Sequence, residues 1–349
     1  MSVAGVGSGA AVSFRLGADP MIRRRLWQSR VFKWVCRVLT YSCLAILGVL
    51  LGSIFWKSTG RLSWDFLTNY SSVDPMRCGI LAGVWGTFWL VFLTACFSIP
   101  VGVGSAVYLE EMAKDSFLVR VIRVNLSNLA GVPSIVYGIL GLTIFRPLTV
   151  WLGKLFDGRS VVNVMGLFRV RLERIEIFDG CVLAGALTIS LVILPTVIIA
   201  SQEALRAVPS SIRVASLALG ATRWQTIWRQ VLPASLPGIA TGVILSISRA
   251  MGEAAPLMMI GVLSKTTLCP GGIESPWQLL RAPGMLLSVP FDQFTAMPVA
   301  IYDWSKQPDP ADRFAAVAAA GIVVLLAVLL SINAVALVVR VRASRNVKW

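Results

Sequence analysis

The sequence predicts an all-α, polytopic membrane protein with six transmembrane helices. Of its 349 residues, 56% are hydrophobic and 14% are charged, and the mean hydropathy is +0.76. About one-quarter of the residues in an ordinary soluble domain are charged, and a helix that crosses a bilayer needs about 20 mainly apolar residues. Six runs approach or exceed this length, and only the fifth contains charged residues: 38–56, 78–109, 124–145, 180–202, 230–264 and 314–339.

The composition also excludes several classes of function. The net charge is +15, but basic residues beside membrane spans are explained by the cytoplasmic bias of Lys and Arg, so no nucleic-acid partner is predicted. The chain has no histidine, which excludes Ser-His and Cys-His catalysis and His-bound metals, and its six cysteines form no C-x-x-C pair. We therefore expect no catalytic residue, no metal site and no cofactor.

The N-terminal segment 1–37 is expected to be cytoplasmic. It carries a cluster of basic residues at 23–25 and further ones up to Arg37, and the apolar run 38–56 follows directly. No small-residue cleavage site follows at the distance typical of a signal peptide, so this run is interpreted as a retained signal anchor, TM1. With six spans, both termini would lie in the cytoplasm.

Proline and glycine are predicted to interrupt the second and third spans. Pro100 lies in the second run, and Gly131, Pro133 and Gly138 lie in the third. Such breaks occur in membranes where the backbone lines a cavity or where helices pack closely, and both alternatives are open here. If the breaks line a pathway, the Ser134 hydroxyl is a candidate substrate contact.

Two polar stretches between spans have distinct patterns. Residues 161–178 alternate apolar and charged side chains, which favours a short β-hairpin or a segment lying on the membrane surface. Glu110 and Glu111 directly follow the second apolar run and are expected at the cytoplasmic surface.

The loop 203–233 predicts a helix-turn-helix at the cytoplasmic surface. Pro209 is suited to start a first helix, and Gly220 is suited to the left-handed position that ends it. Thr222 and Gln225 have the spacing of a capping box for a second helix. The expected apolar face of that helix consists of Trp224, Ile227, Trp228 and Val231. This unit is either a connector packed on the end of the bundle or a docking element for a cytoplasmic partner.

The fifth run contains a charged pair, Arg249 and Glu253, near its middle. An arginine at the centre of a membrane helix costs about 2.5–3.5 kcal/mol, so both side chains should face protein or water. They lie four residues apart on one helical face, in the less favourable order for an ion pair within a helix. Either the pair fixes the helix register, or Arg249 attracts an anion in transit while Glu253 moderates its affinity.

The helix-turn-helix resembles the EAA loop of ABC-importer permeases. The family pattern has EAA, three residues, Gly, nine residues and then I-x-L-P, and this chain matches it at Ala215, Gly220, Leu232 and Pro233. It departs where the family has Glu, Ala and Ile, at Val214, Ser216 and Gln230. The resemblance implies that this loop couples the chain to an ATPase subunit through Arg213, Ala215, Ser216, Leu219, Gly220, Leu232 and Pro233.

Further segments narrow the resemblance to the PstA-type permease family of phosphate ABC importers. They lie in the same order over 78–345: IPVGVGSAVYLEE, GVPSIVYGILGL, SRAMGEAAPLMMIG and MPVAIY. The resemblance implies a type I importer permease (MetI-like) fold for 78–345 and a bacterial inner-membrane location. It also implies three kinds of protein partner: a PstC-like sister permease, two PstB-like ATPase subunits and a PstS-like periplasmic phosphate-binding protein.

The chain itself contains no G-x-x-x-x-G-K-[ST] phosphate loop, so ATP hydrolysis is expected in a partner chain. The expected function is therefore a permease subunit of an ATP-driven phosphate importer, with Arg249, Glu253 and Ser134 in the substrate pathway and membrane lipid around it. The alternatives are a permease for another oxyanion, such as sulfate or molybdate, a passive channel, and a membrane-embedded enzyme.

Overall fold

The computed structural model describes residues 20–114, 116–156, 162–164, 168–170, 180–264, 266, 269–272, 288–308 and 312–344. The chain divides into two units, Met1–Trp56 and Lys57–Trp349. The first unit contains α1 (Pro20–Ser58) up to Trp56, and the described apolar side chains of this helix are largely exposed. Residues 1–19 of the expected cytoplasmic segment lie outside the described residues, whereas the basic part from Pro20 onward is helical.

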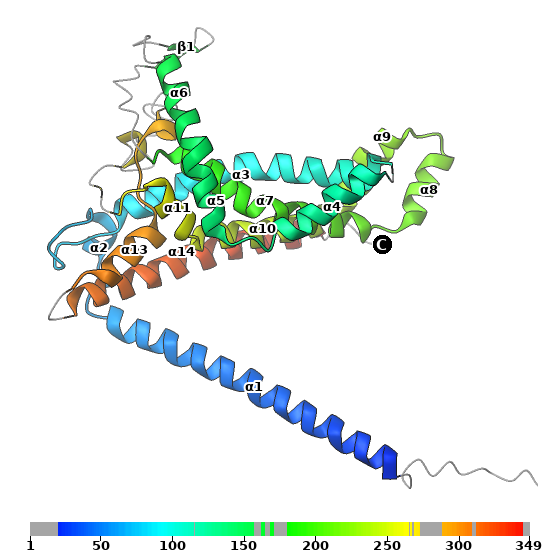
Figure 1. The fold of residues 1–349 in the computed structure, drawn as a ribbon, viewed down its shortest axis with the longest axis horizontal. Helices are drawn as coiled ribbons and strands as arrows, with labels where there is room; N and C mark the ends of the chain where they lie inside the picture. The colour runs from blue at the N-terminus through cyan, green and yellow to red at the C-terminus, as the bar shows by residue number, and fades with distance from the viewer. Residues whose placement is uncertain are drawn as a thin grey trace, which may run out of the picture. The chain divides into compact units, whose positions relative to one another are not determined.

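The second unit is almost entirely helical (Figure 1). Its elements in chain order are α2 (Trp64–Thr68), α3 (Leu81–Val107), the π-helical turn η1 (Tyr108–Met112), α4 (Phe117–Leu129), α5 (Ser134–Leu140), the π-helical turn η2 (Gly141–Phe145), α6 (Arg146–Phe156), β1 (Val162–Val164), β2 (Phe168–Val170), α7 (Val182–Arg206), α8 (Ser210–Ala218), α9 (Arg223–Thr226), the π-helical turn η3 (Ile227–Val231), α10 (Leu232–Gly252), α11 (Ala255–Ile260), the 3-10 turns η4 (Pro270–Gly272) and η6 (Val289–Phe291), α13 (Met297–Lys306) and α14 (Arg313–Ser344).

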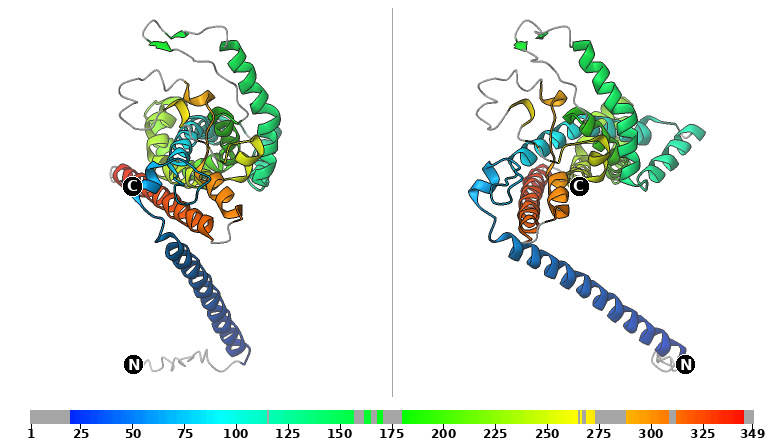
Figure 2. Two further views of the ribbon diagram at one scale, coloured as in Figure 1. Left: turned by 90° about the vertical axis from the view of Figure 1, so that its left-hand side faces the viewer. Right: turned by 60° about the vertical axis from the view of Figure 1, so that its left-hand side comes forward.

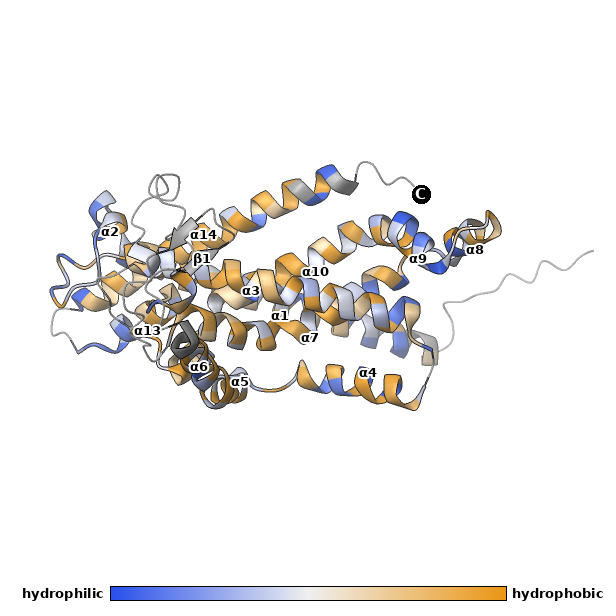
Figure 3. Cartoon of the chain, turned by 90° about the horizontal axis from the view of Figure 1, so that it is seen from above, coloured by the Kyte–Doolittle hydropathy of each residue, from blue (hydrophilic) through white to orange (hydrophobic). Residues whose placement is uncertain are grey.

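Within the described residues, six helical segments are long and apolar enough to cross a membrane, which confirms the predicted number. They are Arg24–Ser58, Leu81–Met112, Ser134–Leu152, Val182–Arg206, Arg223–Gly252 and Arg313–Arg342. Hydrophobic residues cover the middle lengths of α3, α7 and α10, and hydrophilic residues gather towards the helix ends (Figure 3). The predicted β-hairpin is also present, because β1 and β2 pair antiparallel with Val162 opposite Val170.

Helix α7 is the centre of the second unit. It packs against α3 on one side and α10 on another, and two-thirds of its most apolar stretch is buried. Small residues allow these close approaches: Gly102 of α3 lies against Val197, and Gly238 and Gly242 of α10 lie against α7. Helix α14 runs along one side of the unit, in contact with α10 and α13 (Figure 2).

Replacing Gly242 with Val is expected to lower the thermal unfolding midpoint of the purified chain. A Cβ atom at this position would lie 2.3 Å from the Cβ of Ala200, so α7 and α10 would have to separate. Overpacking of this kind costs about 1–3 kcal/mol. The matched control is Gly104→Val on α3, where an added Cβ meets no atom within 4 Å. Equal midpoints for the two variants would contradict the predicted packing role.

Two helix breaks near prolines shift the bounds of the third and fifth spans from the predicted ones. Helix α4 ends at Leu129 and α10 ends at Gly252, each four residues before a proline, Pro133 or Pro256. Proline has no N–H to bond the carbonyl four residues earlier, and at these two positions the helix ends where that hydrogen bond is lost. The third span therefore begins at Ser134 rather than 124, and the fifth ends at Gly252 rather than 264.

The predicted interruption at Pro100 is wrong, because α3 is continuous through it. Packing of neighbouring helices tolerates the lost hydrogen bond at such sites in membrane proteins. At Gly138 the structure favours close packing, since an added Cβ would lie 2.8 Å from the Cα of Pro256 in α11.

Residues 288–296, together with Met297 at the start of α13, join α7 and α3 at the end of the unit opposite to α8 (Figure 1). Val182 N–H donates to the carbonyl of Asp292 (3.1 Å), and Met297 N–H donates to Thr87 Oγ1 (2.9 Å). The Asp292 carboxylate accepts from Gly271 N–H (2.6 Å), and burial raises the pKa of Asp292 above its usual value of 3.8.

The Asp292 carboxyl predicts a pH dependence of stability. Because the folded chain holds this proton to higher pH than the unfolded chain, its stabilising contribution is present below pH 3.8 and is lost as the pH rises through the folded-state pKa. Asp292→Asn keeps an oxygen acceptor for Gly271 N–H and removes this loss. We expect Asp292→Asn to have a higher thermal unfolding midpoint than the unmodified chain at pH 7, and nearly the same midpoint near pH 4. A difference that does not change with pH would contradict the raised pKa of Asp292.

Candidate functional site

The loop between α7 and α10 forms the predicted helix-turn-helix, and we call residues 210–231 the coupling hairpin after the role that the sequence analysis expects for it. Pro209 precedes α8, and Gly220 ends it with φ of +86°, in the left-handed region that favours glycine. Thr222 and Gln225 form the predicted capping box: Gln225 N–H donates to Thr222 Oγ1 (3.2 Å) and Thr222 N–H donates to Gln225 Oε1 (2.9 Å). These local signals position the two helices of the hairpin at one end of the unit (Figure 1).

The second helix of the hairpin does not stop before the membrane span. α9, η3 and α10 form one helical segment, Arg223–Gly252, that continues through Pro233. At 30 residues it is about 45 Å long. One helix therefore joins the coupling hairpin to Arg249 at the other end of α10.

The predicted apolar face of the second helix is split. Ile227 and Val231 are buried, whereas Trp224 and Trp228 are 54% and 53% exposed and lie edge to face, with ring centroids 5.6 Å apart. The π-helical turn adds a residue to the turn at 227–231 and changes the register of the faces along the helix. The two tryptophans are thus available at the surface of the described chain.

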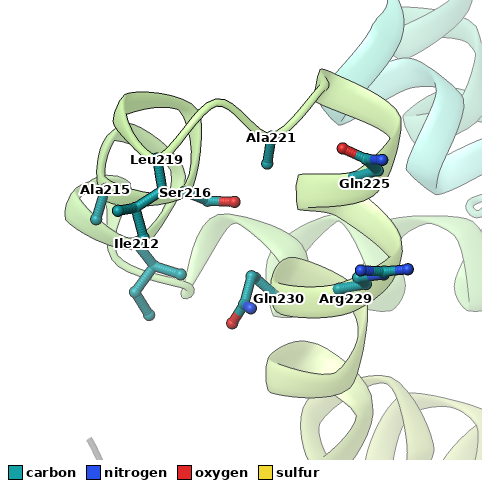
Figure 4. A pocket seen from close by; sticks show the side chains of 8 residues that line it. All are labelled: Ile212, Ala215, Ser216, Leu219, Ala221, Gln225, Arg229 and Gln230. Atoms are coloured by element: carbon teal, nitrogen blue, oxygen red, sulfur yellow. The ribbon is translucent and has the colours of Figure 1, made fainter.

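An open pocket of about 420 Å³ lies between α8 and η3 (Figure 4). Of the predicted coupling residues, Ala215, Ser216 and Leu219 line it from α8 and the turn that follows. Gln225, Arg229 and Gln230 line it from the second helix, together with Ile212 and Ala221. Leu219 is 89% exposed, and Leu232 and Pro233 lie further along, at the start of α10.

Arg213 lies away from this pocket and is held inside the chain. Its Nε and Nη2 atoms donate to the Glu111 carboxylate, Nη1 donates to the carbonyl of Val208 (2.7 Å), and Nη2 also donates to the carbonyl of Leu205 (2.9 Å). The arginine of α8 therefore joins the last turn of α7 to the end of the α3 segment.

Glu110 and Glu111, which the sequence analysis expects at the cytoplasmic surface, each bind an arginine in the structure. Glu110 accepts from Nε and Nη2 of Arg206, the last residue of α7, at 2.8 and 2.9 Å. Both carboxylates belong to η1, and a π-helical turn is a frequent mark of a functional site. These ion pairs had a signal in the sequence: acidic residues follow the second span, basic residues follow the fourth, and both sets are expected on the same side of the membrane.

The predicted Arg249–Glu253 pair is present but does not lie within one continuous helix. Arg249 is in the last turn of α10, Glu253 follows its end, and Arg249 Nε lies 3.3 Å from Glu253 Oε1. The Arg249 side chain is 50% exposed in the chain alone, and Glu253 is 18% exposed. Next to Arg249, Ser248 Oγ donates to Asn333 Oδ1 (2.5 Å) and joins α10 to α14.

Ser134 begins α5, which packs against α11, the helix that follows Glu253. The break before Ser134 is bridged by Tyr137, whose hydroxyl donates to the carbonyl of Leu129 (2.8 Å). This carbonyl has no helical donor at Pro133 and also accepts from Val132 N–H (3.1 Å). The two helix breaks at 130–133 and 253–254 therefore belong to neighbouring, packed elements.

Comparison with known proteins agrees with this architecture. Residues 98–343 match the family described as binding-protein-dependent transport system inner membrane component. The probable ABC transporter permease protein YqgI of Bacillus subtilis is 31% identical over 230 residues, covering 65% of this chain and 69% of the relative.

Two further relatives are named as phosphate transport system permeases. PstC of Mesorhizobium japonicum is 30% identical over 257 residues, covering 70% of this chain and 75% of the relative. PstA 1 of Mycobacterium tuberculosis (strain CDC 1551 / Oshkosh) is 33% identical over 207 residues, covering 59% of each chain. Among solved structures, a bacterial alginate ABC transporter in complex with its alginate-bound periplasmic protein is similar in fold, with a TM-score of 0.54 and 15% identity over 89% of this chain and 96% of that one.

Proposed function

Because the chain belongs to the family of binding-protein-dependent transport system inner membrane components, it is a multi-pass permease component of an ABC importer, and we propose that its substrate is inorganic phosphate. The observation that carries the proposal is the similarity, over most of the chain, to relatives named PstA and PstC phosphate transport permeases.

The charge of the helix break supports an anionic substrate. Arg249 is half-exposed at the end of α10, in a segment apolar enough to cross a membrane. A guanidinium matches the oxygens of phosphate with two parallel N–H donors. Glu253, paired with the same arginine, lowers the local positive potential, so that a bound anion is released again rather than trapped. Ser134 of the neighbouring broken span is the proposed hydroxyl contact.

The proposed assembly has four kinds of subunit. A PstC-like sister permease would supply the other half of the pathway, two PstB-like ATPase subunits would bind the coupling hairpins, and a PstS-like protein would deliver phosphate from the periplasm. Ala215, Ser216, Leu219 and Gly220 are the proposed contact region of the hairpin, with Leu232 and Pro233 at its base. The hairpin and both termini would then lie in the cytoplasm of a bacterium, and ATP hydrolysis would take place in the partner chains.

Uptake of labelled phosphate tests the proposal. We would compare cells that carry this chain with cells that lack it, with the other transporter subunits present and with excess sulfate or molybdate as competitor. Loss of uptake on deletion, without competition by the other oxyanions, is the expected result. Competition by sulfate or molybdate would reassign the substrate, and unchanged phosphate uptake in cells without another phosphate importer would refute it.

A further inference from the structure

We propose that Glu111 and Arg213 form a clamp that positions the coupling hairpin and transmits its movement to α3 and α7. The proposal rests on the coupling role of the hairpin under the proposed function. It assigns to Arg213 a role within the chain, in place of a contact with the ATPase, and it adds Glu111 as a positioning residue.

The bonding of Arg213 is the first support. Each nitrogen of its guanidinium donates to a group of this chain: Nε to Glu111, Nη1 to the Val208 carbonyl, and Nη2 to both Glu111 and the Leu205 carbonyl. The two carbonyls belong to the end of α7 and the residues just after it, where the regular helical hydrogen bonds stop. The Leu205 carbonyl also accepts from Val208 N–H (3.3 Å). A rigid planar fork fits three acceptors from two directions, and an ammonium group on a flexible stem does not.

The setting of Glu111 is the second support. The side chains of Glu111 and Arg213 are only 9% and 24% exposed, although they lie 102 residues apart in the sequence. They line a small pocket of about 200 Å³ together with Leu217 of α8 and with Arg223, Thr226 and Ile227 of the second hairpin helix. Limited contact with water makes this ion pair stronger and more specific in geometry than an exposed pair.

A second, more exposed ion pair joins the same helix ends. Arg206 at the end of α7 binds Glu110, the residue before Glu111, but the Arg206 side chain is 52% exposed. Adjacent residues of one π-helical turn therefore hold Arg206, just before the hairpin, and Arg213, within it. Arg123 of α4 also lies 3.9 Å from Glu110. Because the outer pair is more exposed to water, we expect it to contribute less than the inner pair.

A second connection joins α8 to α10 through the other helix of the hairpin. The hydroxyl oxygens of Ser216 and Thr226 are 2.9 Å apart, which ties α8 to α9. α9 continues through η3 and α10 to the helix break beside Arg249. A displacement of α8 is thus passed to α3 and α7 through the clamp and to α10 through the continuous helix.

The test uses the complete transporter, with sister permease and ATPase subunits, in vesicles supplied with the phosphate-binding protein. The variants are Glu111→Gln and Arg213→Lys, and the matched control is Glu203→Gln, which removes an exposed carboxylate one turn before Arg206. We expect the amount of phosphate imported per ATP hydrolysed to fall at least about tenfold in both variants, as for the loss of a typical coupling between sites. ATP hydrolysis itself should remain, and the control should match the unmodified complex.

Arg213→Lys is the decisive variant because it keeps the positive charge. A merely electrostatic role would leave it close to normal, whereas the clamp requires the planar fork. Normal import per ATP in Arg213→Lys would overturn the proposal. A further comparison uses the single variants Glu111→Gln and Arg213→Gln and the double variant that combines them. The double variant should import no less phosphate per ATP than the weaker of the two single variants. Additive losses would overturn the proposal, because they would show that the two side chains act independently.

A second measurement does not depend on the substrate. Amide hydrogen exchange of residues 210–218 should accelerate in Glu111→Gln and Arg213→Lys, but not in Glu203→Gln, while exchange in α3 and α7 stays slow. Unchanged exchange in α8 would overturn the clamp whatever the transporter carries. Failure of the unmodified complex to import phosphate would instead refute the proposed substrate and leave this measurement valid.

Discussion

Replacing Arg249 with Gln is expected to lower phosphate uptake about 100-fold, with the transporter still assembled. A hydrogen bond to a charged group contributes about 1.5–3 kcal/mol, and each 1.4 kcal/mol corresponds to about a factor of ten, so loss of the guanidinium donors to the anion accounts for this effect. Arg249 lies at the break between α10 and α11, paired with Glu253 at 3.3 Å, so its loss leaves a carboxylate facing the proposed path of an anion. Initial rates of labelled-phosphate uptake, divided by the amount of complex in the membrane, give the measurement.

Two further variants determine what such a loss means. Arg342→Gln removes an exposed arginine in the last turn of α14 and should leave uptake unchanged. Glu253→Gln keeps Arg249 and removes its counter-charge, so we expect tighter anion binding, seen as a lower KM, together with a lower maximal rate. Uptake by Arg249→Gln within about twofold of normal, a difference of a few tenths of a kcal/mol, would mean that the pair only fixes helix register.

Replacing Gly220 with Val is expected to reduce ATPase binding and uptake about tenfold through the backbone alone. Gly220 has φ of +86°, and an added Cβ would meet no atom within 4 Å, so the only penalty is conformational. A left-handed backbone costs an ordinary residue about 1–2 kcal/mol, and a β-branched residue rarely adopts it. The turn between α8 and α9 would open, and the pocket between α8 and η3 would lose its shape.

The matched control at this position is Gly220→Asn, because asparagine adopts the left-handed region more readily than other residues with side chains. We expect Gly220→Asn to keep most of the uptake and to co-purify with the ATPase subunit, whereas Gly220→Val should not. If both variants behave alike, the side chain itself rather than the backbone angle disturbs the hairpin.

Much of the fold follows from local sequence signals. The six spans depend on runs of apolar residues that a bilayer selects by length. Gly220 and the Thr222–Gln225 capping box act within a few residues of one another, and the structure has them as predicted. The helix ends at Leu129 and Gly252 have a local contribution, since each lies four residues before a proline. The local signal is not sufficient, because α3 continues through Pro100.

The tertiary structure alone decided which charged groups meet and which faces are covered. Glu111 and Arg213 are 102 residues apart, and only the packing of α3 on α7 brings their helix ends together. Trp224 and Ile227 share one predicted apolar face, yet the neighbouring helices leave the first exposed and cover the second. The spacing of apolar residues predicts which helix face can be buried. The neighbouring helices decide which residues of that face are buried, because this depends on contacts between residues distant in the sequence.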